Sequence, residues 1–278
     1  MNPKNSMNND TKNYILIDGS YFIFYRYYAL IQWWNVSKQE PVLDNPCDNE
    51  RFIELYKTTF IKKIHEISKK LKISNPIYIV GKDCPREKIW RHSFIEHYKE
   101  TRKSDNYAGF FFKLTYEENL FEKAGVNHVV SYPELEADDC IALTCKYISN
   151  VYNQDSYNIY IIANDMDYIQ LLSHNIYIYN LKYKLITNIN TQDEANKYLF
   201  CKILMGDKSD NIPSIFPKCG IKTAIKCYED KKYFENKLEN IDTRQLYERN
   251  RKIIDFNHIP QYLVDNFLKY LVLNVYFN

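Results

Sequence analysis

Three short apolar runs, each followed by carboxylates, decide the fold of this chain: residues 15–18 read ILID, residues 76–83 read PIYIVGKD and residues 158–167 read NIYIIANDMD. Runs of β-branched and aromatic residues of this length are typical of buried strands, and here they alternate with longer helical patterns. The alternation predicts an α/β fold in which helices flank a mostly parallel sheet. The expected strands comprise residues 14–17, 76–80, 127–131, 158–163 and 175–180.

Helical spacing marks the segments between these strands. Apolar residues recur at helical spacing across residues 50–71, which predicts a helix that crosses between the first two strands. Another helix is expected to start at Leu135 and to run through EADDCIALTCKYI. From about Thr191 helical patterns dominate, interrupted by DNIPSIFPKCGIK. The predicted organisation is a disordered lead-in, an α/β core and a helical domain, at residues 1–13, 14–190 and 191–278.

The composition excludes several classes of protein. The 278 residues carry 37 Lys and Arg against 35 Asp and Glu, which excludes a broadly basic nucleic-acid coat. The apolar runs are far shorter than the roughly 20 residues that span a bilayer, and the first 13 residues lack the apolar part of a secretory signal. Seven cysteines without a CxxC pair indicate free thiols rather than disulfides or a zinc ribbon. We therefore expect an intracellular protein, with cytoplasm, nucleus and viral factory not distinguished.

Nine carboxylates stand out: seven fall where strands end or a helix begins, and Asp207 and Asp210 lie in MGDKSDN just beyond the expected domain boundary. Because the carboxyl ends of parallel strands meet at one edge of a sheet, these side chains are expected to converge. They are Asp18, Asp83, Glu136, Asp138, Asp139, Asp165, Asp167, Asp207 and Asp210. Such a cluster repels itself unless cations lie within it, and ligands made only of oxygen favour Mg²⁺ or Mn²⁺ over zinc. Two such ions are the usual arrangement for hydrolysis of a phosphodiester by water.

Each acidic group by itself also has a purely structural explanation. Acids in the first turn of a helix, such as Asp138 and Asp139, meet the helix dipole and cap backbone N–H groups. Acids after strands, such as Asp165 and Asp167, are ordinary turn residues. The conjunction of several acidic groups at one sheet edge is what favours a metal site.

Five motifs occur in an order and spacing that is highly specific. They read ILIDGSYFIFYR, IYIVGKD with WRHSFIEHYKETR, ELEADD, IIANDMDYIQLL, and ILMGDKSDNIP with KCGIKTA, and they cover roughly residues 14–228. In these motifs the chain resembles the flap endonucleases and 5′→3′ exonucleases, which include the 5′ nuclease domain of bacterial DNA polymerase I and phage enzymes. The resemblance implies a PIN-like (resolvase-like) nuclease core followed by a helix-hairpin-helix variant called H3TH. It also implies that all nine acids bind metal.

Basic residues between the second and third expected strands form a modest local patch. Residues 84–106 carry six Lys and Arg against four Asp and Glu, a pattern that a solvated amphipathic helix would also explain. By resemblance, Lys99 and Arg102 contact the scissile phosphate and stabilise its charge. Two further residues are assigned to DNA binding, Tyr98 as a stacking platform for a base and Arg91. The resemblance also places an arch over the site at about residues 84–113.

The segment expected to hold duplex DNA departs from the family. Relatives usually carry a Gly-x-Gly turn before a Lys-Thr-Ala helix, whereas PSIFPKCGIKTA contains one glycine, Gly220. That glycine still permits a helix N-terminus, with Lys222 and Thr223, to meet a phosphate through backbone N–H groups. The family also implies a K⁺ ion at this hairpin, which the missing glycine argues against. A plain helical hairpin that packs the C-terminal helices is the alternative.

Together these features favour a structure-specific 5′ nuclease, a 5′→3′ exonuclease or flap endonuclease acting as a monomer on DNA with a 5′ end, flap or nick. The resemblance implies that water attacks the phosphodiester and leaves a 5′-phosphate, in replication, repair or recombination. Two alternatives stay open: RNase H-like removal of RNA primers on the same scaffold, and a non-catalytic protein that binds DNA junctions. The composition would suit a viral member of the family.

Overall fold

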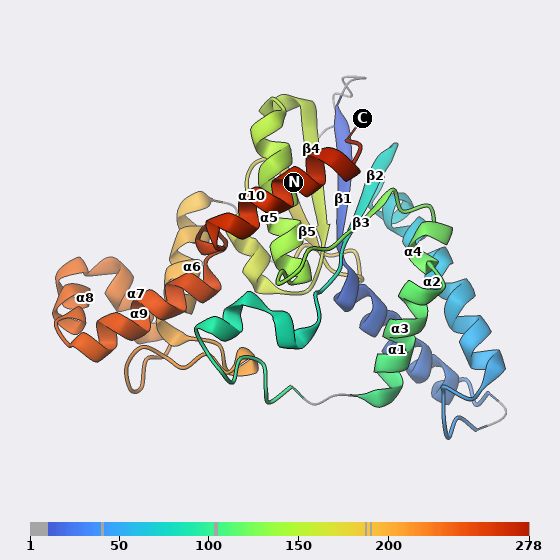
Figure 1. Ribbon diagram of the computed structural model, residues 1–278, viewed down its shortest axis with the longest axis horizontal. Helices are drawn as coiled ribbons and strands as arrows, with labels where there is room; N and C mark the ends of the chain where they lie inside the picture. Colours follow the sequence, from blue (N-terminus) through green and yellow to red (C-terminus); the bar gives the residue numbers. More distant parts are fainter. Residues whose placement is uncertain (1–10, 40–41, 103–104, 187, 190, 278) are drawn as a thin grey trace.

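Five parallel strands form a single sheet in the order β3-β2-β1-β4-β5 (Figure 1). The computed structural model of the chain describes residues 11–39, 42–102, 105–186, 188–189 and 191–277. The strands are β1 (Lys12–Asp18), β2 (Pro76–Gly81), β3 (His128–Val130), β4 (Tyr157–Ile162) and β5 (Ile176–Tyr179). The chain adds β2 and β3 on one side of β1 and then β4 and β5 on the other. The strand order therefore reverses beside β1, the place where ligands bind in open parallel sheets.

The five predicted strands are confirmed, with ends that differ by at most two residues. The largest difference is at β1, which begins at Lys12, so the predicted lead-in over 1–13 is wrong for its last two residues. Residues 1–10 of that lead-in lie outside the described residues. Asn13 belongs to the strand because it pairs with Pro76 on β2 and with Asn158 on β4.

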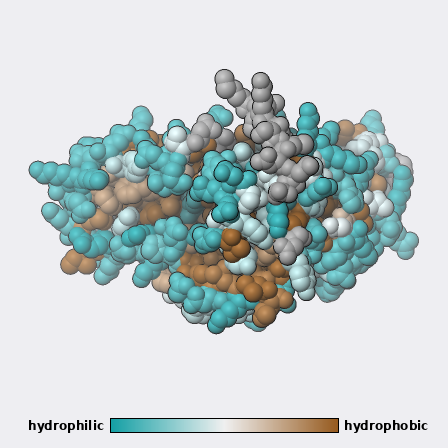
Figure 2. Space-filling model, turned by 90° about the horizontal axis from the view of Figure 1, so that it is seen from above, coloured by the Kyte–Doolittle hydropathy of each residue, from teal (hydrophilic) through white to brown (hydrophobic). Residues whose placement is uncertain are grey.

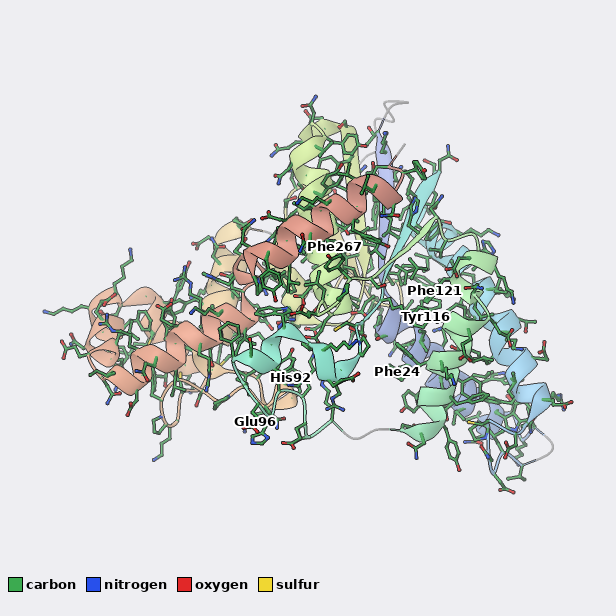
Figure 3. The ribbon with its side chains drawn as sticks, viewed as in Figure 1. Phe24, His92, Glu96, Tyr116, Phe121 and Phe267 are labelled. Atoms are coloured by element: carbon green, nitrogen blue, oxygen red, sulfur yellow. The ribbon has the colours of Figure 1, made fainter. Side chains whose placement is uncertain are left out.

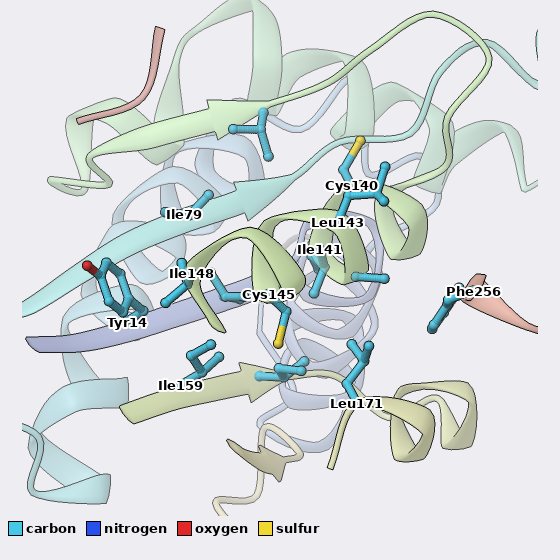
Figure 4. Close-up of a cluster of buried hydrophobic side chains, with 14 of the residues drawn as sticks. Tyr14, Ile79, Cys140, Ile141, Leu143, Cys145, Ile148, Ile159, Leu171 and Phe256 are labelled. Carbon is cyan, nitrogen blue, oxygen red and sulfur yellow. The ribbon is translucent and has the colours of Figure 1, made fainter. Parts of the chain in front are cut away.

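Side chains of the strands point alternately into two hydrophobic cores. Ile15 and Ile17 of β1 enter one core, and Tyr14 and Leu16 enter the other, as the two-residue period of a strand requires. The first core is covered by α1 (Gly19–Val36), α2 (Glu50–Leu71), α3 (Asn106–Glu117) and α4 (Leu120–Lys123). The second core, drawn in Figure 4, is covered by α5 (Ala137–Val151) and α10 (Gln261–Asn274).

Helix α2 has the bounds that its apolar spacing predicts. Asn49 caps its first turn by accepting the backbone N–H of Phe52 at 2.9 Å. The buried side chains recur every three or four residues, so one stripe of the helix faces the core. The helix ends where Lys72 takes a left-handed backbone conformation.

Helix α5 starts two residues later than predicted. Glu136 has extended backbone angles and forms a capping box with Asp139, so the first helical residue is Ala137 rather than Leu135. This correction matters for the site, because it makes Glu136 the N-cap residue and leaves Asp138 and Asp139 in the first turn.

A separate group of helices follows the sheet. It comprises α6 (Gln192–Met205), α7 (Ile221–Glu229), α8 (Lys231–Leu238) and α9 (Ile241–Ile254). These four helices, called here the helical part, enclose a third core that also takes in Ile89 and Tyr98 from the segment after β2. Helix α10 then returns to the sheet and buries Phe267 and Leu271 in the second core. The predicted helical domain over 191–278 therefore extends too far, because α10 packs with the α/β core.

The predicted arch over residues 84–113 is divided between two places in the fold. Residues 84–102 contain η1 (Arg86–Lys88) and η2 (Trp90–Ser93) and run along the helical part, as the teal segment with His92 and Glu96 shows in Figure 3. From Asn106 the chain forms α3, which packs against α1. Phe111 of α3 is buried and stacks on Tyr27 with ring centroids 4.9 Å apart. This half of the segment is therefore part of the first core.

Most of the molecular surface in Figure 2 is hydrophilic, with a hydrophobic patch at the lower centre of that view. Within the part of the chain that the structure describes, no helix combines the length and apolar character needed to cross a membrane. All seven cysteines have free thiols, as predicted, and six of them are buried.

Candidate active site

Three of the nine acids stand at the carboxyl ends of neighbouring strands. Asp18 is the last residue of β1, Asp83 follows β2 and Asp165 follows β4. The charges of Asp83 and Asp165 both act on Asp18. The structure thus brings these three carboxylates to one edge of the sheet.

Asp18 is held in place by two hydrogen bonds. Its Oδ1 accepts the backbone N–H of Tyr21 at 2.9 Å, which caps α1, and its Oδ2 accepts the hydroxyl of Tyr168 at 3.0 Å. Burial, together with the charge of Asp83, raises the pKa of Asp18 to about 6. An acid that resists ionisation for these reasons is stabilised as an anion when a cation lies nearby.

Asp83 connects β2 to the starts of two helices. It accepts a hydrogen bond from the hydroxyl of Ser20 in α1 and another, of 2.7 Å, from the backbone N–H of Ala137 in α5. Burial raises the pKa of Asp83 as well. The first residues of α5, including its acids, are thereby fixed against the end of β2.

Glu136, Asp138 and Asp139 form a compact group at the start of α5. Each offers a carboxylate oxygen within 4.8 Å of the other two. Burial raises the pKa of Asp138 well above its usual range, and the charges of Asp139 and Glu136 act in the same direction. Three carboxylates in such proximity, two of them buried and one half-buried, form an oxygen-only donor set that suits a divalent cation such as Mg²⁺ or Mn²⁺. The side chains therefore fit the metal that the motifs imply.

Protein cations already pair with Glu136. Its Oε1 accepts a hydrogen bond from Lys99 at 2.5 Å, and its Oε2 accepts bonds from Arg91 at 2.8 Å and from the hydroxyl of Tyr98 at 3.1 Å. Burial disfavours the charged form, but Lys99 and then Arg91 outweigh it and lower the pKa of Glu136 to about 2. Glu136 is thus an anion throughout the physiological range.

A second acidic group comprises the two aspartates after β4 and the two in the loop after α6. Lys202 of α6 forms ion pairs with Asp167 and, at 3.1 Å, with Asp207. Arg102 pairs with Asp210, whose Oδ2 also lies 3.8 Å from the Nζ of Lys99. Burial and the charge of Asp165 raise the pKa of Asp167 to about 6 even though Lys202 opposes the shift.

The two acidic groups meet at one small cavity. Its wall includes Asp138 from the first group and three aspartates from the second, together with the basic residues that pair with them. The acidic side chains in this wall are Asp138, Asp167, Asp207 and Asp210. Asp165 is exposed beside the same segment. Four of the nine acids that the sequence pattern predicts to converge therefore line one cavity.

Lys99 stands in a strained backbone conformation between the two groups. Its φ of 56° lies in the left-handed region, which costs a non-glycine residue on the order of 1–3 kcal/mol. Its backbone N–H donates to the carbonyl of Asp210 at 3.1 Å, and its own carbonyl accepts the N–H of Arg102 at 3.1 Å. These contacts hold the conformation and aim the ammonium group at both acidic groups.

Two predicted DNA contacts are corrected. Arg91 and Tyr98 are each only 3% exposed. Tyr98 packs in the third core, and its hydroxyl bonds to Glu136 and Asp210, so its ring does not offer a free stacking surface. The guanidinium of Arg91 donates hydrogen bonds to the buried carboxylates of Glu136 and Asp139. Neither can reach DNA without leaving the interior.

Sequence reasoning missed four residues that support the acids. Lys202, Tyr168, Ser20 and Trp90 bond to Asp167, Asp18, Asp83 and Asp139. Tyr168 and Ser20 lie within the quoted motifs, but their spacing shows no ligand pattern. Lys202 is a single lysine shortly before MGDKSD, and no pattern in the sequence indicated that it would pair with the acids.

The residues predicted to hold duplex DNA lie apart from the acids. Gly220 is the N-cap of α7, and a Cβ placed on it would meet nothing within 4 Å. Lys222 is exposed and Thr223 half-buried in the first turn. Figure 1 shows α7 in the helical part, well to one side of the sheet.

The chain matches a family model described as the N-terminal, resolvase-like domain of 5′-3′ exonucleases, over residues 13–199. It is also 31% identical over 247 residues to a 5′-3′ exonuclease of Buchnera aphidicola subsp. Acyrthosiphon pisum. This match covers 86% of the present chain and 78% of the relative.

Solved structures of a bacteriophage T5 protein resemble the whole chain. The T5 D15 protein co-crystallised with metal ions matches with a TM-score of 0.63 and 18% identity, over 95% of this chain and 100% of that one. The T5 D15 flap endonuclease in a pseudo-enzyme-product complex with DNA and metal ions matches with a TM-score of 0.62 and 17% identity, over 94% and 98% of the two chains. At this level of identity the likeness shows a shared fold.

Proposed function

The chain belongs to the 5′-3′ exonuclease family, and from this premise we propose that it is a structure-specific 5′ nuclease that uses divalent metal to hydrolyse DNA at a free 5′ end, flap or nick. The nuclease activity follows from the family. The DNA substrate is supported by the T5 flap endonuclease, whose structure contains DNA and metal ions. Replication, repair or recombination would provide such substrates.

The observation that carries the proposal is the convergence of four acids from three separate segments, Asp138, Asp167, Asp207 and Asp210, on one cavity. Burial raises the pKa of Asp138 and of Asp167, so these two carboxylates lie where ionisation is unfavourable without a cation. A protein that only binds DNA has no use for such a cluster, because it faces a polyanion. The acids thus support catalysis rather than binding alone.

We assign the acids to two ions, Mg²⁺ or Mn²⁺, on the basis of which side chains lie together. One would be held by Glu136 and Asp138, with Asp18 and Asp83 around it. The other would be held by the second group, which comprises Asp165, Asp167, Asp207 and Asp210. When bound, such ions activate a water molecule and stabilise the leaving oxygen of the phosphodiester.

The basic residues have separate roles in this proposal. Lys99 and Arg102 lie at the junction of the two acidic groups, where the scissile phosphate would be bound, and their charges would stabilise the transition state. Lys202 would keep Asp167 and Asp207 in place.

The helical part would hold the duplex. The N-terminus of α7, with Gly220, Lys222 and Thr223, would meet a phosphate, since the space beside Gly220 is open: a Cβ placed there would meet nothing within 4 Å. The positive φ in this turn belongs to Lys218 rather than to a glycine, so the turn differs from the one that the family's K⁺ site implies. We do not extend the K⁺ ion to this chain.

A cleavage assay tests the proposal directly. The purified chain would be incubated with a 5′-flap duplex, a nicked duplex and an RNA/DNA hybrid, in Mg²⁺, in Mn²⁺ and in EDTA. We expect metal-dependent products from the DNA substrates that begin at the 5′ end or the flap junction. Cleavage of only the RNA strand would favour primer removal, and tight junction binding without cleavage in either metal would contradict a nuclease.

A further inference from the structure

Arg91 is buried where three segments of the chain meet. It lies in η2, and its Nε donates to the carbonyl of Ile253, in the last turn of α9, at 3.0 Å. Its Nη1 donates to Glu136 at 2.8 Å, and Nη1 and Nη2 each donate to Asp139 at 2.7 Å. An interior guanidinium is tolerated only when it is paired as fully as this.

Asp139 has both carboxylate oxygens occupied by protein donors. Its Oδ1 accepts from Arg91, and its Oδ2 accepts from Arg91, from the indole N–H of Trp90 at 2.9 Å and from the backbone N–H of Glu136 at 3.2 Å. The side chain is fully buried, whereas Asp138 lines the cavity. A metal ion at Asp139 would have to displace the fork of Arg91, an indole N–H and a backbone N–H, whereas an ion at Asp138 would displace none of these. Glu136 differs from Asp139 because the hydrogen bond to its Oε1 comes from the flexible side chain of Lys99.

The same end of α9 is also held by the segment that carries the second acidic group. The side-chain amide of Gln170, in η4 (Met166–Leu171), donates to the carbonyl of Ile254 at 3.0 Å. Its oxygen accepts the backbone N–H of Phe256 at 3.0 Å. The end of α9 is therefore tied to both acidic groups, to the first by Arg91 and to the second by Gln170.

We propose that Arg91 and Asp139 are positioning residues, an ion pair that orients the metal ligand Glu136 and ties it to the end of α9, and that Asp139 itself does not ligate metal. The inference rests on the proposed metal centre. Its consequence is that a shift of the helical part on DNA moves Ile253, and through Arg91 it moves Glu136. Substrate binding and metal binding are thereby coupled.

A double-mutant cycle on metal affinity tests this proposal. Arg91→Gln, Asp139→Asn and the double variant would be titrated with Mn²⁺ by calorimetry, in the full chain and without DNA. Each single change should weaken Mn²⁺ binding about 10- to 100-fold, the usual effect of losing a group that orients a ligand. The double variant should be no weaker than the weaker single variant, because one unit has been lost. Raising Mn²⁺ should restore cleavage in all three.

Direct ligation by Asp139 gives a different pattern. Asp139→Asn would then weaken binding equally with or without Arg91, so that the losses in the double variant multiply, and this outcome would overturn the proposal. Arg91→Lys adds a second criterion, since it keeps the charge but loses the planar fork. Affinity near that of the wild type in Arg91→Lys would show that charge alone matters and would also contradict positioning.

Folding is monitored separately, since a buried charge without a partner is strongly destabilising. If either single variant fails to fold, Arg91→Leu with Asp139→Leu removes both charges together. Mn²⁺ binding within about 100-fold of the wild type supports the proposal, and loss of binding overturns it.

Arg244→Gln is the matched control, because Arg244 also donates its Nε to a backbone carbonyl, that of Leu238, within the helical part. It should leave Mn²⁺ affinity unchanged. A wild-type chain that binds no Mn²⁺ would overturn the proposed function itself, an outcome distinct from any difference among the variants.

Discussion

Asp18 and Asp167 illustrate how a single residue depends on its surroundings. Both have pKa values raised from 3.8 to about 6, Asp18 by burial and Asp83, and Asp167 by burial and Asp165. The folded protein therefore holds protons on them that the unfolded chain has lost. The free energy of unfolding of the metal-free protein should fall as pH rises from about 4 through about 6.

This gives a prediction for unfolding temperature against pH. In EDTA, the unfolding temperature should decrease between about pH 5 and pH 7, and excess Mg²⁺ should raise it more at pH 7 than at pH 5, because the metal binds the ionised acids. Asp18→Asn should flatten the curve in EDTA. Glu136 does not interfere, since its pKa is lowered to about 2. A metal effect that is equal at both pH values would contradict the prediction.

Lys99 carries a prediction about rate. Lys99→Ala should reduce kcat by about 10²-fold or more, with a smaller effect on affinity, because the contact strengthens as charge develops on the phosphate. Single-turnover cleavage of a flap substrate measures this effect. Lys88→Ala, an exposed lysine in the same segment, is the control and should keep the wild-type rate. An unchanged rate in Lys99→Ala would show that the lysine serves only to pair with Glu136.

The second acidic group carries a prediction that separates DNA binding from catalysis. Asp165→Ala combined with Asp167→Ala removes two proposed ligands of one ion, so cleavage in Mg²⁺ should collapse. DNA binding should survive or strengthen, because negative charge has been removed and Lys202 has been released from Asp167. Gel-shift titration in Ca²⁺ or EDTA measures binding separately. Near-normal turnover would contradict the assignment of two ions.

At the scale of elements, the N-terminus of α7 is proposed to bind a phosphate of duplex DNA, and Lys222 in its first turn tests this role. Lys222→Ala should weaken binding to all duplex-bearing substrates alike, since a phosphate contact carries no base information. The slope of log K against log salt should become shallower by about one unit. Cleavage of a short single strand should be nearly unchanged. Lys269→Ala on α10 removes the same charge from a helix that packs on the sheet and should leave the slope unaltered. A steady slope in Lys222→Ala would mean that α7 only packs the helical part.

At the scale of the whole molecule, α10 makes the end of the chain part of the α/β core. Phe267 is fully buried in the second core, where its ring contacts that of Tyr132, so Phe267→Ala should destabilise the protein by about 3–5 kcal/mol. Urea unfolding followed by circular dichroism measures the change. Tyr262→Ala on the same helix removes a side chain that is 54% exposed and should cost far less. Equal costs would mean that α10 contributes little to the core.

Local sequence patterns were enough to predict the strands, helix α2 and the acidic positions that follow the strands. The strands and α2 could be predicted because the spacing of apolar residues within a segment indicates whether it forms a strand or a helix. The acidic positions could then be placed relative to these elements. The convergence of the acids could also be inferred, because parallel strands share one carboxyl edge. The start of α5 was misplaced because Glu136 can serve either as a helical residue or as a cap.

By itself, the sequence determined the α/β class, the strands, helices α2 and α5, the positions of the acids along the chain and the family. Only the tertiary structure decided which basic residues face the acids, that Arg91 and Tyr98 are interior, that α3 and α10 pack with the sheet, and that Lys202 pairs with the second acidic group. These facts depend on contacts between residues far apart in the sequence, such as Arg91 and Ile253, which are 162 positions apart. The spacing of side chains along a segment encodes which face of that segment is buried, but it does not encode which distant group that face will meet.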